Sequence, residues 1–165
     1  MNSKNSSALS NQRIGIFGKG GAGKSTVAVL LSQALRIEGY HVIVIDADST
    51  NAGIPQALGF EQPPKPLLEY YGGMVFSGGK ITCPVDDPTP LEGSHVDIRQ
   101  LPKEYYRQSD GLSLMIAGKI GDKGPGAGCD GPIVKIGRDL RVHVEDEHPV
   151  TVINFKAGFD YQRQG

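Results

Sequence analysis

The chain has 165 residues, a formal net charge of −1 and two cysteines. This length fits one domain that can bury most of its apolar surface without cross-links. The near-zero charge gives no basic field for nucleic-acid binding, and two cysteines make no disulfide framework, so a reducing cytoplasm is expected. No apolar run approaches the ~18 residues of a membrane span, so no membrane segment is expected.

The first twelve residues, Met1 to Gln12, are rich in serine and asparagine. They lack the apolar core of a signal peptide or an anchor. We therefore expect residues 1–12 to be a disordered tail and residues 13–165 to form the domain.

Two apolar runs frame the first predicted unit. Residues 14–17 read IGIF and residues 41–46 read HVIVID. Continuous runs of this kind are typical of strands that are covered on both faces in a parallel sheet. Between them, residues 25–38 form a mostly apolar helix that Gly39 closes. The result is a strand–loop–helix–strand unit of the size that a right-handed crossover needs.

Two further strands are predicted at residues 112–117 and 150–155. A helix over about 132–144 would join them in a second crossover, although Gly137 lowers its helical propensity. The predicted fold class is therefore α/β, with a parallel β-sheet flanked by helices.

The stretch from about residue 60 to residue 110 mixes proline, glycine and a few aromatic residues without a sustained hydrophobic period. We expect an irregular insertion that holds a short helix near 67–71 and a hairpin around 78–85. Long irregular stretches inside a compact domain are often functional.

The residues from Gly18 to Thr26 read GKGGAGKST and contain the Walker A spacing G-x4-G-K-S of a phosphate-binding loop. Glycines let successive N–H groups turn toward an anion, and the following helix adds the positive end of its dipole. Lys24 would reach the β- and γ-phosphates, and Ser25 would ligate Mg²⁺. The predicted nucleotide-binding residues of this loop are Gly18, Gly20, Gly21, Ala22, Gly23, Lys24, Ser25 and Thr26.

The same glycines also fit the dinucleotide fingerprint G-x-G-x-x-G. Asp46 lies 23 residues after Gly23, near the place where that motif has its ribose-binding acid. A dinucleotide fold has no need for Lys-Ser directly after its third glycine. Asp48 and Ser49, which follow Asp46, are more typical of an acidic loop beside a metal. A dinucleotide-binding oxidoreductase domain is therefore the weaker alternative.

A second lysine in the loop, Lys19, makes this stretch resemble the deviant Walker A motif K-G-G-x-G-K-[ST] of the MinD/ParA/nitrogenase-iron-protein family, a SIMIBI-type group of P-loop ATPases. The resemblance covers residues 13–160. It implies that Lys19 crosses a dimer interface and contacts the phosphates held by the partner subunit. A cation supplied in this way stabilises the transferring phosphoryl group and makes hydrolysis depend on dimerisation.

The segment DADSTNAG, residues 46–53, resembles the switch I segment of the same family. The resemblance implies that Asp46 lies near Mg²⁺ and that Asp48 orients the attacking water. Solvated acids at a strand end are the structural alternative for both residues.

The segment INFKAGFD, residues 153–160, resembles the switch II segment. Gly158 matches the glycine whose N–H senses the γ-phosphate. Asn154 stands where the family has an aspartate. An amide can hydrogen-bond a Mg²⁺-bound water but carries no negative charge, so weaker magnesium affinity or slower turnover is expected. The predicted metal-side residues are Ser25, Asp46 and Asn154.

Residues 118–131 resemble the loop before the third helix in the nitrogenase iron protein and in the nickel-insertion ATPase CooC. Cys129 matches a cluster cysteine there, but no second cysteine follows it. A dimer would supply two thiolates, fewer than the four that a cluster or closed zinc site needs. A structural or vestigial role for Cys129 is therefore favoured over metal binding.

The phosphate-loop pattern and the family resemblance together imply Mg²⁺-dependent ATP hydrolysis by a cytoplasmic, nucleotide-dependent homodimer that acts on an unidentified client protein, and the resemblance is nearest to the CooC-like maturation ATPases. The predicted catalytic residues are Lys19, Lys24 and Asp48. Family members continue with further strands beyond switch II, so we expect the domain to be incomplete at its C-terminus. That expectation and Asn154 motivate an alternative, a nucleotide-dependent interaction module that does not hydrolyse ATP.

Overall fold

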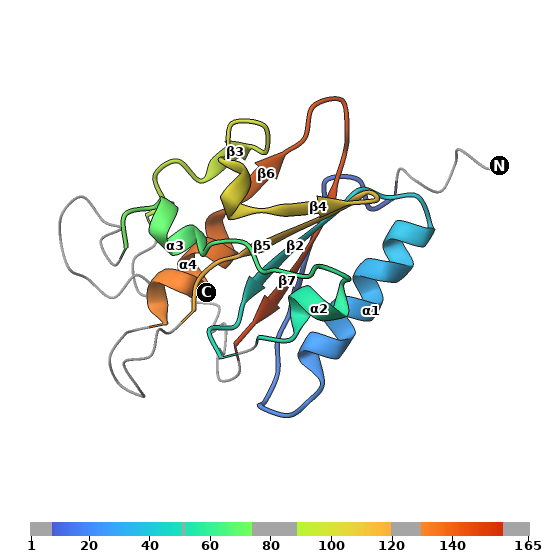
Figure 1. Cartoon of the computed structure of the whole chain (residues 1–165), viewed down its shortest axis with the longest axis horizontal. Coiled ribbons are helices and arrows are strands. Elements are labelled where there is room, and N and C mark those ends of the chain that lie inside the picture. The colour runs from blue at the N-terminus through green and yellow to red at the C-terminus, as the bar shows by residue number, and fades with distance from the viewer. Residues whose placement is uncertain (1–7, 51, 74–88, 120–129, 157–165) are drawn as a thin grey trace, which may run out of the picture.

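The computed structural model describes residues 8–50, 52–73, 89–119 and 130–156. Figure 1 shows the arrangement of its helices and strands. In chain order these are β1 (Arg13–Ile16), α1 (Lys24–Ile37), β2 (Val42–Ala47), α2 (Ile54–Ala57), α3 (Leu67–Tyr70), β3 (His95–Asp97), the 3₁₀ helix η1 (Lys103–Tyr105), β4 (Arg107–Ser109), β5 (Leu112–Ile116), α4 (Gly131–Asp139), β6 (Arg141–His143) and β7 (Val150–Phe155).

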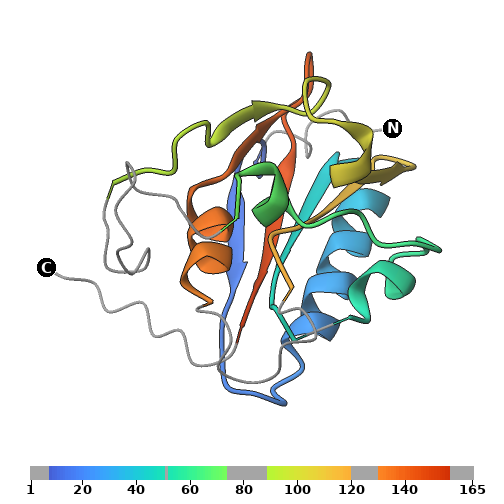
Figure 2. The ribbon, with the colours of Figure 1, turned by 60° about the vertical axis from the view of Figure 1, so that its left-hand side comes forward.

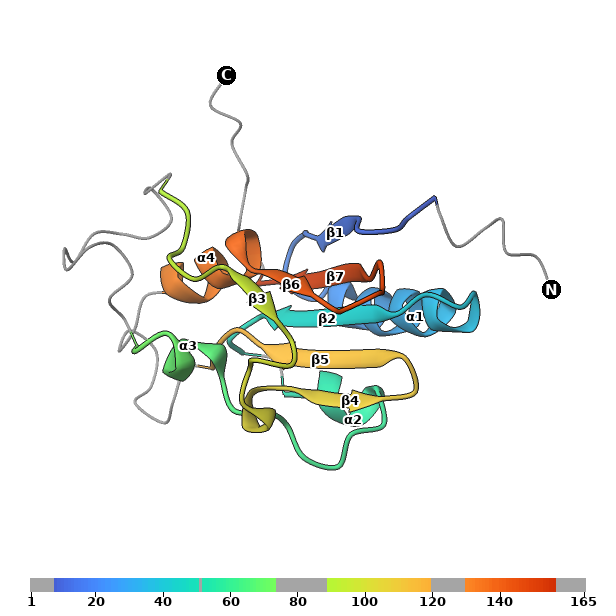
Figure 3. The same ribbon diagram turned by 90° about the horizontal axis from the view of Figure 1, so that it is seen from above.

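The main sheet has the strand order β1-β7-β2-β5-β4, which Figure 3 shows from above. The pairs β1–β7, β7–β2 and β2–β5 are parallel, and β4 runs antiparallel to β5. The strand β7, the last that the structure describes, therefore lies between the first two strands. A separate parallel pair is formed by β3 and β6. The predicted α/β fold with a mainly parallel sheet is confirmed.

The sheet is covered on both faces, as the continuous apolar runs predicted. Every residue of β2, β5 and β7 is buried. Val42 and Val44 of β2 pack in a cluster with residues of α1 and α2, whereas Ile43 and Ile45 pack in a second cluster with residues of α4. Figure 2 shows the sheet between these two helical layers. Each such fully buried side chain contributes about 1.5–3 kcal/mol of hydrophobic stabilisation.

The strand β4 was not predicted from the sequence. It joins β5 through Asp110 and Gly111, which have φ angles of 52° and 72°. Positive φ at both central residues is the condition for a two-residue type I′ hairpin turn, and Asp-Gly is a preferred sequence for it. The dipeptide was a usable signal inside a stretch that otherwise lacks periodicity.

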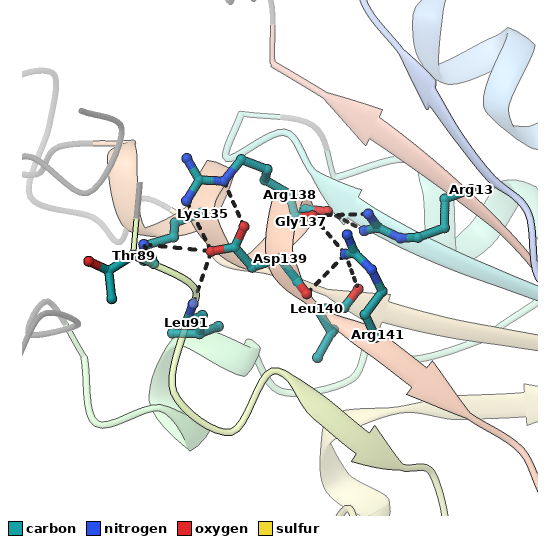
Figure 4. A network of polar contacts seen from close by, with 9 residues as sticks. All are labelled: Arg13, Thr89, Leu91, Lys135, Gly137, Arg138, Asp139, Leu140 and Arg141. Atoms are coloured by element: carbon teal, nitrogen blue, oxygen red, sulfur yellow. Dashed lines mark hydrogen bonds and ion pairs between the residues drawn. The ribbon is translucent and has the colours of Figure 1, made fainter. Parts of the chain in front are cut away.

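The helix α4 is shorter than the predicted helix over 132–144, because it ends at Asp139. The next residues pair as β6 with β3 instead of continuing the helix. Arg13 donates to the carbonyl oxygens of residues 138 and 137 at 2.9 and 2.7 Å, and Arg141 donates to that of residue 138 at 2.8 Å (Figure 4). These arginines satisfy carbonyls that lack helical partners at the end of α4.

The carboxylate of Asp139 holds the segment before β3 against α4 (Figure 4). Its Oδ2 accepts the backbone N–H of Leu91 at 3.0 Å, and its Oδ1 accepts the Arg138 Nε–H at 2.6 Å. These contacts lower the pKa of Asp139, against the opposing effect of its burial. On the other side, burial and the nearby charge of Arg141 lower the pKa of Arg13 to about 10.

Other local predictions have different outcomes. The short helix near residue 67 is present as α3. The hairpin expected around 78–85 and residues 1–7 lie outside the described residues. Residues 8–12, predicted as part of the disordered tail, form a turn with Leu9 packed against the core. Among the described residues, no helix has the length and apolar character needed to cross a membrane.

Gly137 lets α4 lie close to the sheet. A Cβ atom at this position would come within 2.9 Å of Ala47 Cβ and 3.0 Å of Phe155 Cε1. We expect Gly137→Ala to lower the free energy of unfolding by about 1–3 kcal/mol through overpacking, measured by denaturant titration.

Helix propensity alone predicts the opposite sign, a gain of about 1 kcal/mol for Gly137→Ala. The control variant is Ala34→Gly on the exposed face of α1, which measures helix propensity at a site away from the sheet. It should lower the free energy of unfolding by about 1 kcal/mol. A Gly137→Ala variant as stable as the wild-type chain would contradict the packing role.

Candidate functional site

The carboxyl ends of the central strands lie side by side at one edge of the sheet. Asn154 of β7 stands in register with Ile16 of β1 on one side and with Asp46 of β2 on the other, and Asp46 is in register with Ile116 of β5. The loops that follow these strands therefore leave the sheet at the same edge. In open α/β sheets this edge is where ligands bind.

The glycine loop follows β1 at this edge. Gly18, Gly21 and Gly23 have φ angles of 145°, 78° and 79°. A Cβ atom on Gly21 or Gly23 would meet nothing within 4 Å. The loop therefore requires glycine at these two positions for its backbone conformation and not for space. At the start of the loop, Phe17 stacks on Phe155 at the end of β7, with ring centroids 4.5 Å apart.

The helix α1 begins at Lys24, directly after this loop, and no side chain caps its N-terminus. The Lys24 side chain folds back over the loop, where its Nζ donates to the carbonyl oxygen of Lys19 at 3.2 Å. Lys24 is only 8% exposed. An ammonium group, backbone N–H groups and the positive end of a helix dipole are thus gathered at one place, an arrangement that suits an anion.

A cavity of about 410 Å³ lies beside the loop. The loop and the start of α1 form one side of it, and residues that follow β2 and β7 form the other. Its lining residues are Gly20, Gly21, Gly23, Lys24, Ser25, Thr26, Asp48, Thr50 and Lys156.

Three predicted metal-side residues lie together at the ends of β2, β7 and the loop. The Asn154 Nδ2 donates to Asp46 Oδ1 at 3.1 Å and lies 3.4 Å from Ser25 Oγ. The Asn154 Oδ1 is buried and has no hydrogen-bond partner among the described residues. Hydroxyl, carboxylate and amide oxygens are the ligands that Mg²⁺ prefers in proteins. The residues at this position therefore fit a magnesium ion, and the unpartnered amide oxygen is an acceptor that could meet a metal-bound water.

Asp46 is a carboxylate in the sheet interior, with a fully buried side chain. Burial raises the pKa of Asp46, while Lys119 and hydrogen bonds from Asn154 and the Asp48 backbone act in the opposite direction. Lys119 donates through its Nζ to Asp46 Oδ2 at 2.7 Å and to the carbonyl oxygen of Asp48 at 2.7 Å. The charge of this carboxylate is thus balanced by a lysine from the end of β5.

Asp48 lies at the cavity with 8% of its surface exposed. Its Oδ1 accepts the backbone N–H of Thr50 at 3.0 Å and the Thr50 hydroxyl at 2.7 Å. These bonds form a local Asx turn that fixes the carboxylate. The next residue, Ser49, donates to Asp130 Oδ1 at 2.6 Å, and Asp130 also pairs with Lys156. The segments after β2 and β7 and the start of α4 are tied together by these contacts.

The structure brings most predicted site residues to one cavity, but not all of them. Gly18, Lys19 and Ala22 belong to the loop without lining the cavity, and the Lys19 residue is exposed. Asp46 and Asn154 are fully buried and do not line the cavity either. Gly158 and Cys129 lie outside the described residues. Within the described ranges, no cluster of three or more His, Cys, Asp or Glu side chains could hold a metal ion.

Sequence reasoning missed two lysines, Lys119 and Lys156. Lys119 comes two residues after the predicted strand 112–117 and Lys156 one residue after the predicted strand 150–155, and parallel strands end at a common edge. That placement was the available signal, but a lysine after a strand is usually a solvated surface residue.

Comparisons with known proteins identify the family of P-loop proteins to which this chain is related. Residues 11–78 match the family described as ParA, NUBPL iron-transfer P-loop NTPase. Over 155 residues the chain is 32% identical to an uncharacterized ATP-binding protein of Methanocaldococcus jannaschii, with 93% of this chain and 61% of the relative aligned. The chain belongs to the ParA/MinD-type P-loop NTPase family. This membership decides against the dinucleotide-binding alternative.

Other known proteins are similar over nearly the whole chain. The carbon monoxide dehydrogenase accessory protein CooC of Rhodospirillum rubrum is 27% identical, with 93% of this chain and 57% of that protein aligned. The cell division ATPase MinD of Pyrococcus furiosus matches with a TM-score of 0.51 at 20% identity, over 91% of this chain and 52% of that one. MinD of Pyrococcus horikoshii, solved with Mg-ADP, matches with a TM-score of 0.52 at 18% identity, over 90% and 50%.

The two MinD structures establish a shared fold and no more at these identities. The chain spans between one half and about three fifths of the length of these relatives. What the complete relatives bind or act on is therefore a matter for proposal here.

Proposed function

We propose that this P-loop NTPase binds ATP with Mg²⁺ in the cavity beside the glycine loop and hydrolyses it. The observation that carries this proposal is the Lys24 ammonium, held at the N-terminus of α1 next to the cavity. This ammonium donates a hydrogen bond to the uncharged carbonyl oxygen of Lys19. A phosphate oxygen is a stronger, charged acceptor and would replace it.

The remaining loop residues would hold the triphosphate without chemistry of their own. The N–H groups between Gly20 and Thr26 would face the phosphates, and Gly18 and Ala22 would support the loop backbone. Gly158 would add an N–H near the γ-phosphate. This assignment makes positioning and electrostatic stabilisation the main contributions of the protein, as is general for phosphoryl transfer.

Ser25, Asp46 and Asn154 would hold Mg²⁺ on the side of the loop nearest β2. When bound, the ion neutralises charge on the phosphates. Asp48 would orient a water for in-line attack, because the Asx turn fixes its carboxylate at the cavity.

The exposed Lys19 is proposed to act across a nucleotide-dependent homodimer. A cation from the partner subunit would stabilise the transition state only when two chains meet, so hydrolysis would report dimer formation. Relatives named as a carbon monoxide dehydrogenase accessory protein, as iron–sulfur cluster carrier proteins and as a cytosolic Fe-S cluster assembly factor support a cytoplasmic role in the maturation of a metal-containing client protein.

Replacing Lys24 tests nucleotide binding directly. Removal of one charged donor predicts that Lys24→Ala binds ATP about 10- to 100-fold more weakly than the wild-type chain in Mg²⁺. Isothermal titration measures the affinity, and phosphate release measures turnover. The control is Lys103→Ala, an exposed lysine in η1 away from the cavity. Wild-type affinity and turnover in Lys24→Ala would rule out the assignment of this loop.

Replacing Lys19 tests the dimer mechanism. We expect Lys19→Ala to bind ATP with near wild-type affinity but to lose about 10³-fold in hydrolysis rate, the scale of a cation supplied in trans. Sedimentation of the wild-type chain with Mg²⁺ and a non-hydrolysable ATP analogue should show dimers. A wild-type hydrolysis rate per chain that does not depend on protein concentration would contradict this mechanism.

A second function, nucleotide-dependent interaction without hydrolysis, is favoured by one observation. Asn154 is neutral and already donates to Asp46, so Asp46 is the one charged side chain among the three metal-side residues. If the missing charge limits turnover, restoring it should produce an active ATPase.

Asn154→Asp separates these two functions. We expect the variant to need about tenfold less Mg²⁺ for nucleotide binding, because a second carboxylate is added beside Asp46. Without metal its melting temperature should fall, since two buried carboxylates then repel each other. Binding without turnover in the wild-type chain, together with phosphate release by Asn154→Asp, would favour the interaction module. Turnover in the wild-type chain would favour the ATPase.

A further inference from the structure

Lys119 makes the closest charged contact of the buried carboxylate at the proposed magnesium position. It follows β5, and its Nζ lies 2.7 Å from Asp46 Oδ2. The Lys119 side chain is 26% exposed, whereas the Asp46 side chain is fully buried. The same ammonium donates to the carbonyl oxygen of Asp48 at 2.7 Å. One lysine therefore joins the end of β5 to both the carboxylate and the backbone of the segment after β2.

Both oxygens of Asp46 are engaged. Oδ2 accepts from Lys119, and Oδ1 accepts from Asn154 Nδ2 and from the Asp48 backbone N–H at 3.2 Å. One acceptor site remains on Oδ2, but it lies beside the Lys119 ammonium, so a metal ion or a metal-bound water reaches this carboxylate more readily if a donor leaves. The Asn154 amide is held in the buried strand β7, and the Asp48 donor is a backbone N–H, so neither moves easily. Lys119 has a flexible four-carbon stem and a path to solvent.

The charges at this position also identify Lys119 as the donor that leaves. Asp46 carries the negative charge of the metal-side group, and the adjacent Lys119 ammonium cancels it. A divalent cation that shared Asp46 with this ammonium would face a like charge at short distance, which disfavours both. With Lys119 displaced, the full charge of Asp46 becomes available to the metal.

We propose that Lys119 and Mg²⁺ exclude each other at Asp46, so that Lys119 is a tethered counter-cation that sets the magnesium requirement of the site. In the metal-free chain Lys119 neutralises the buried carboxylate and holds the Asp48 carbonyl. When Mg²⁺ arrives with nucleotide, Lys119 releases both groups together, which frees the backbone that carries Asp48. This inference rests on the proposed function in so far as Mg²⁺ binds beside Ser25.

The first experiment compares Lys119→Met with Lys103→Met, a matched change at an exposed lysine outside the site. Mg²⁺ is titrated into each protein at a fixed concentration of a fluorescent ATP analogue. Removal of the competing charge should lower the half-saturating Mg²⁺ concentration by about tenfold in Lys119→Met, with no change in Lys103→Met. An unchanged or higher value in Lys119→Met would overturn the proposal.

The melting temperature gives a readout that does not involve activity. Without Lys119, Asp46 is an uncompensated buried charge, so Lys119→Met should melt below the wild-type chain in EDTA. Mg²⁺ should then raise the melting temperature of Lys119→Met more than it raises that of the wild-type chain. Equal magnesium responses would show a purely structural lysine.

A measurement on the wild-type chain covers the case in which Lys119→Met does not fold. Brief acetylation with an amine-reactive reagent, followed by mass spectrometry, reports the access of each lysine. Lys119 should label weakly in EDTA and several-fold more with Mg²⁺ and a non-hydrolysable ATP analogue, while Lys103 stays constant. Nucleotide binding without any rise at Lys119 would overturn the exchange.

These readouts separate the inference from the proposed function. A wild-type chain that binds no nucleotide at any Mg²⁺ concentration contradicts the proposed function. Millimolar Mg²⁺ alone would then serve as the probe, and a rise in Lys119 acetylation would still support the exchange at Asp46. No rise under that condition would overturn it.

Discussion

One buried carboxylate organises the functional edge of this chain. Asp46 is the penultimate residue of β2 in the centre of the sheet, with β7 on one side and β5 on the other. A charge in that position is stable only if donors surround it, and Asn154, Lys119 and the Asp48 backbone supply them. Each of these donors comes from a different strand end or from the segment after β2. Satisfying a single side chain therefore fixes the relative position of three segments that the proposed reaction needs.

The glycine loop is held to this centre by packing and by hydrogen bonds. Phe17 stacks on Phe155, so the start of the loop is fixed against the end of β7. At the other end of the loop, Ser25 lies 3.4 Å from the Asn154 amide nitrogen. The loop itself adopts backbone angles that only glycine reaches at low cost. A loop held in this way is a rigid cradle for an anion, and rigidity lowers the entropic cost of binding.

Three side chains set the balance of charge at this site. Asn154 removes a negative charge from the metal side, while Lys119 and Lys156 place positive charges beside Asp46 and the cavity. Together these changes in charge make the site less favourable for a divalent cation and more favourable for phosphate groups. Such a site suits a protein whose magnesium and nucleotide steps are coupled to movement of the segment that carries Asp48, which is the physical requirement for a nucleotide-dependent switch.

Local patterns in the sequence determined the central elements and the glycine loop. The apolar runs at 41–46, 112–117 and 150–155 were long enough to mark strands covered on both faces, and Gly18 to Thr26 carry a spacing with a direct chemical purpose. Tertiary structure alone decided where β7 inserts and where α4 ends, because those outcomes depend on pairing between distant segments and on arginines from two different strands. It also decided that Lys119 faces Asp46, 73 residues away in the chain. No local period encodes that contact, since it arises only when two parallel strands end at the same edge.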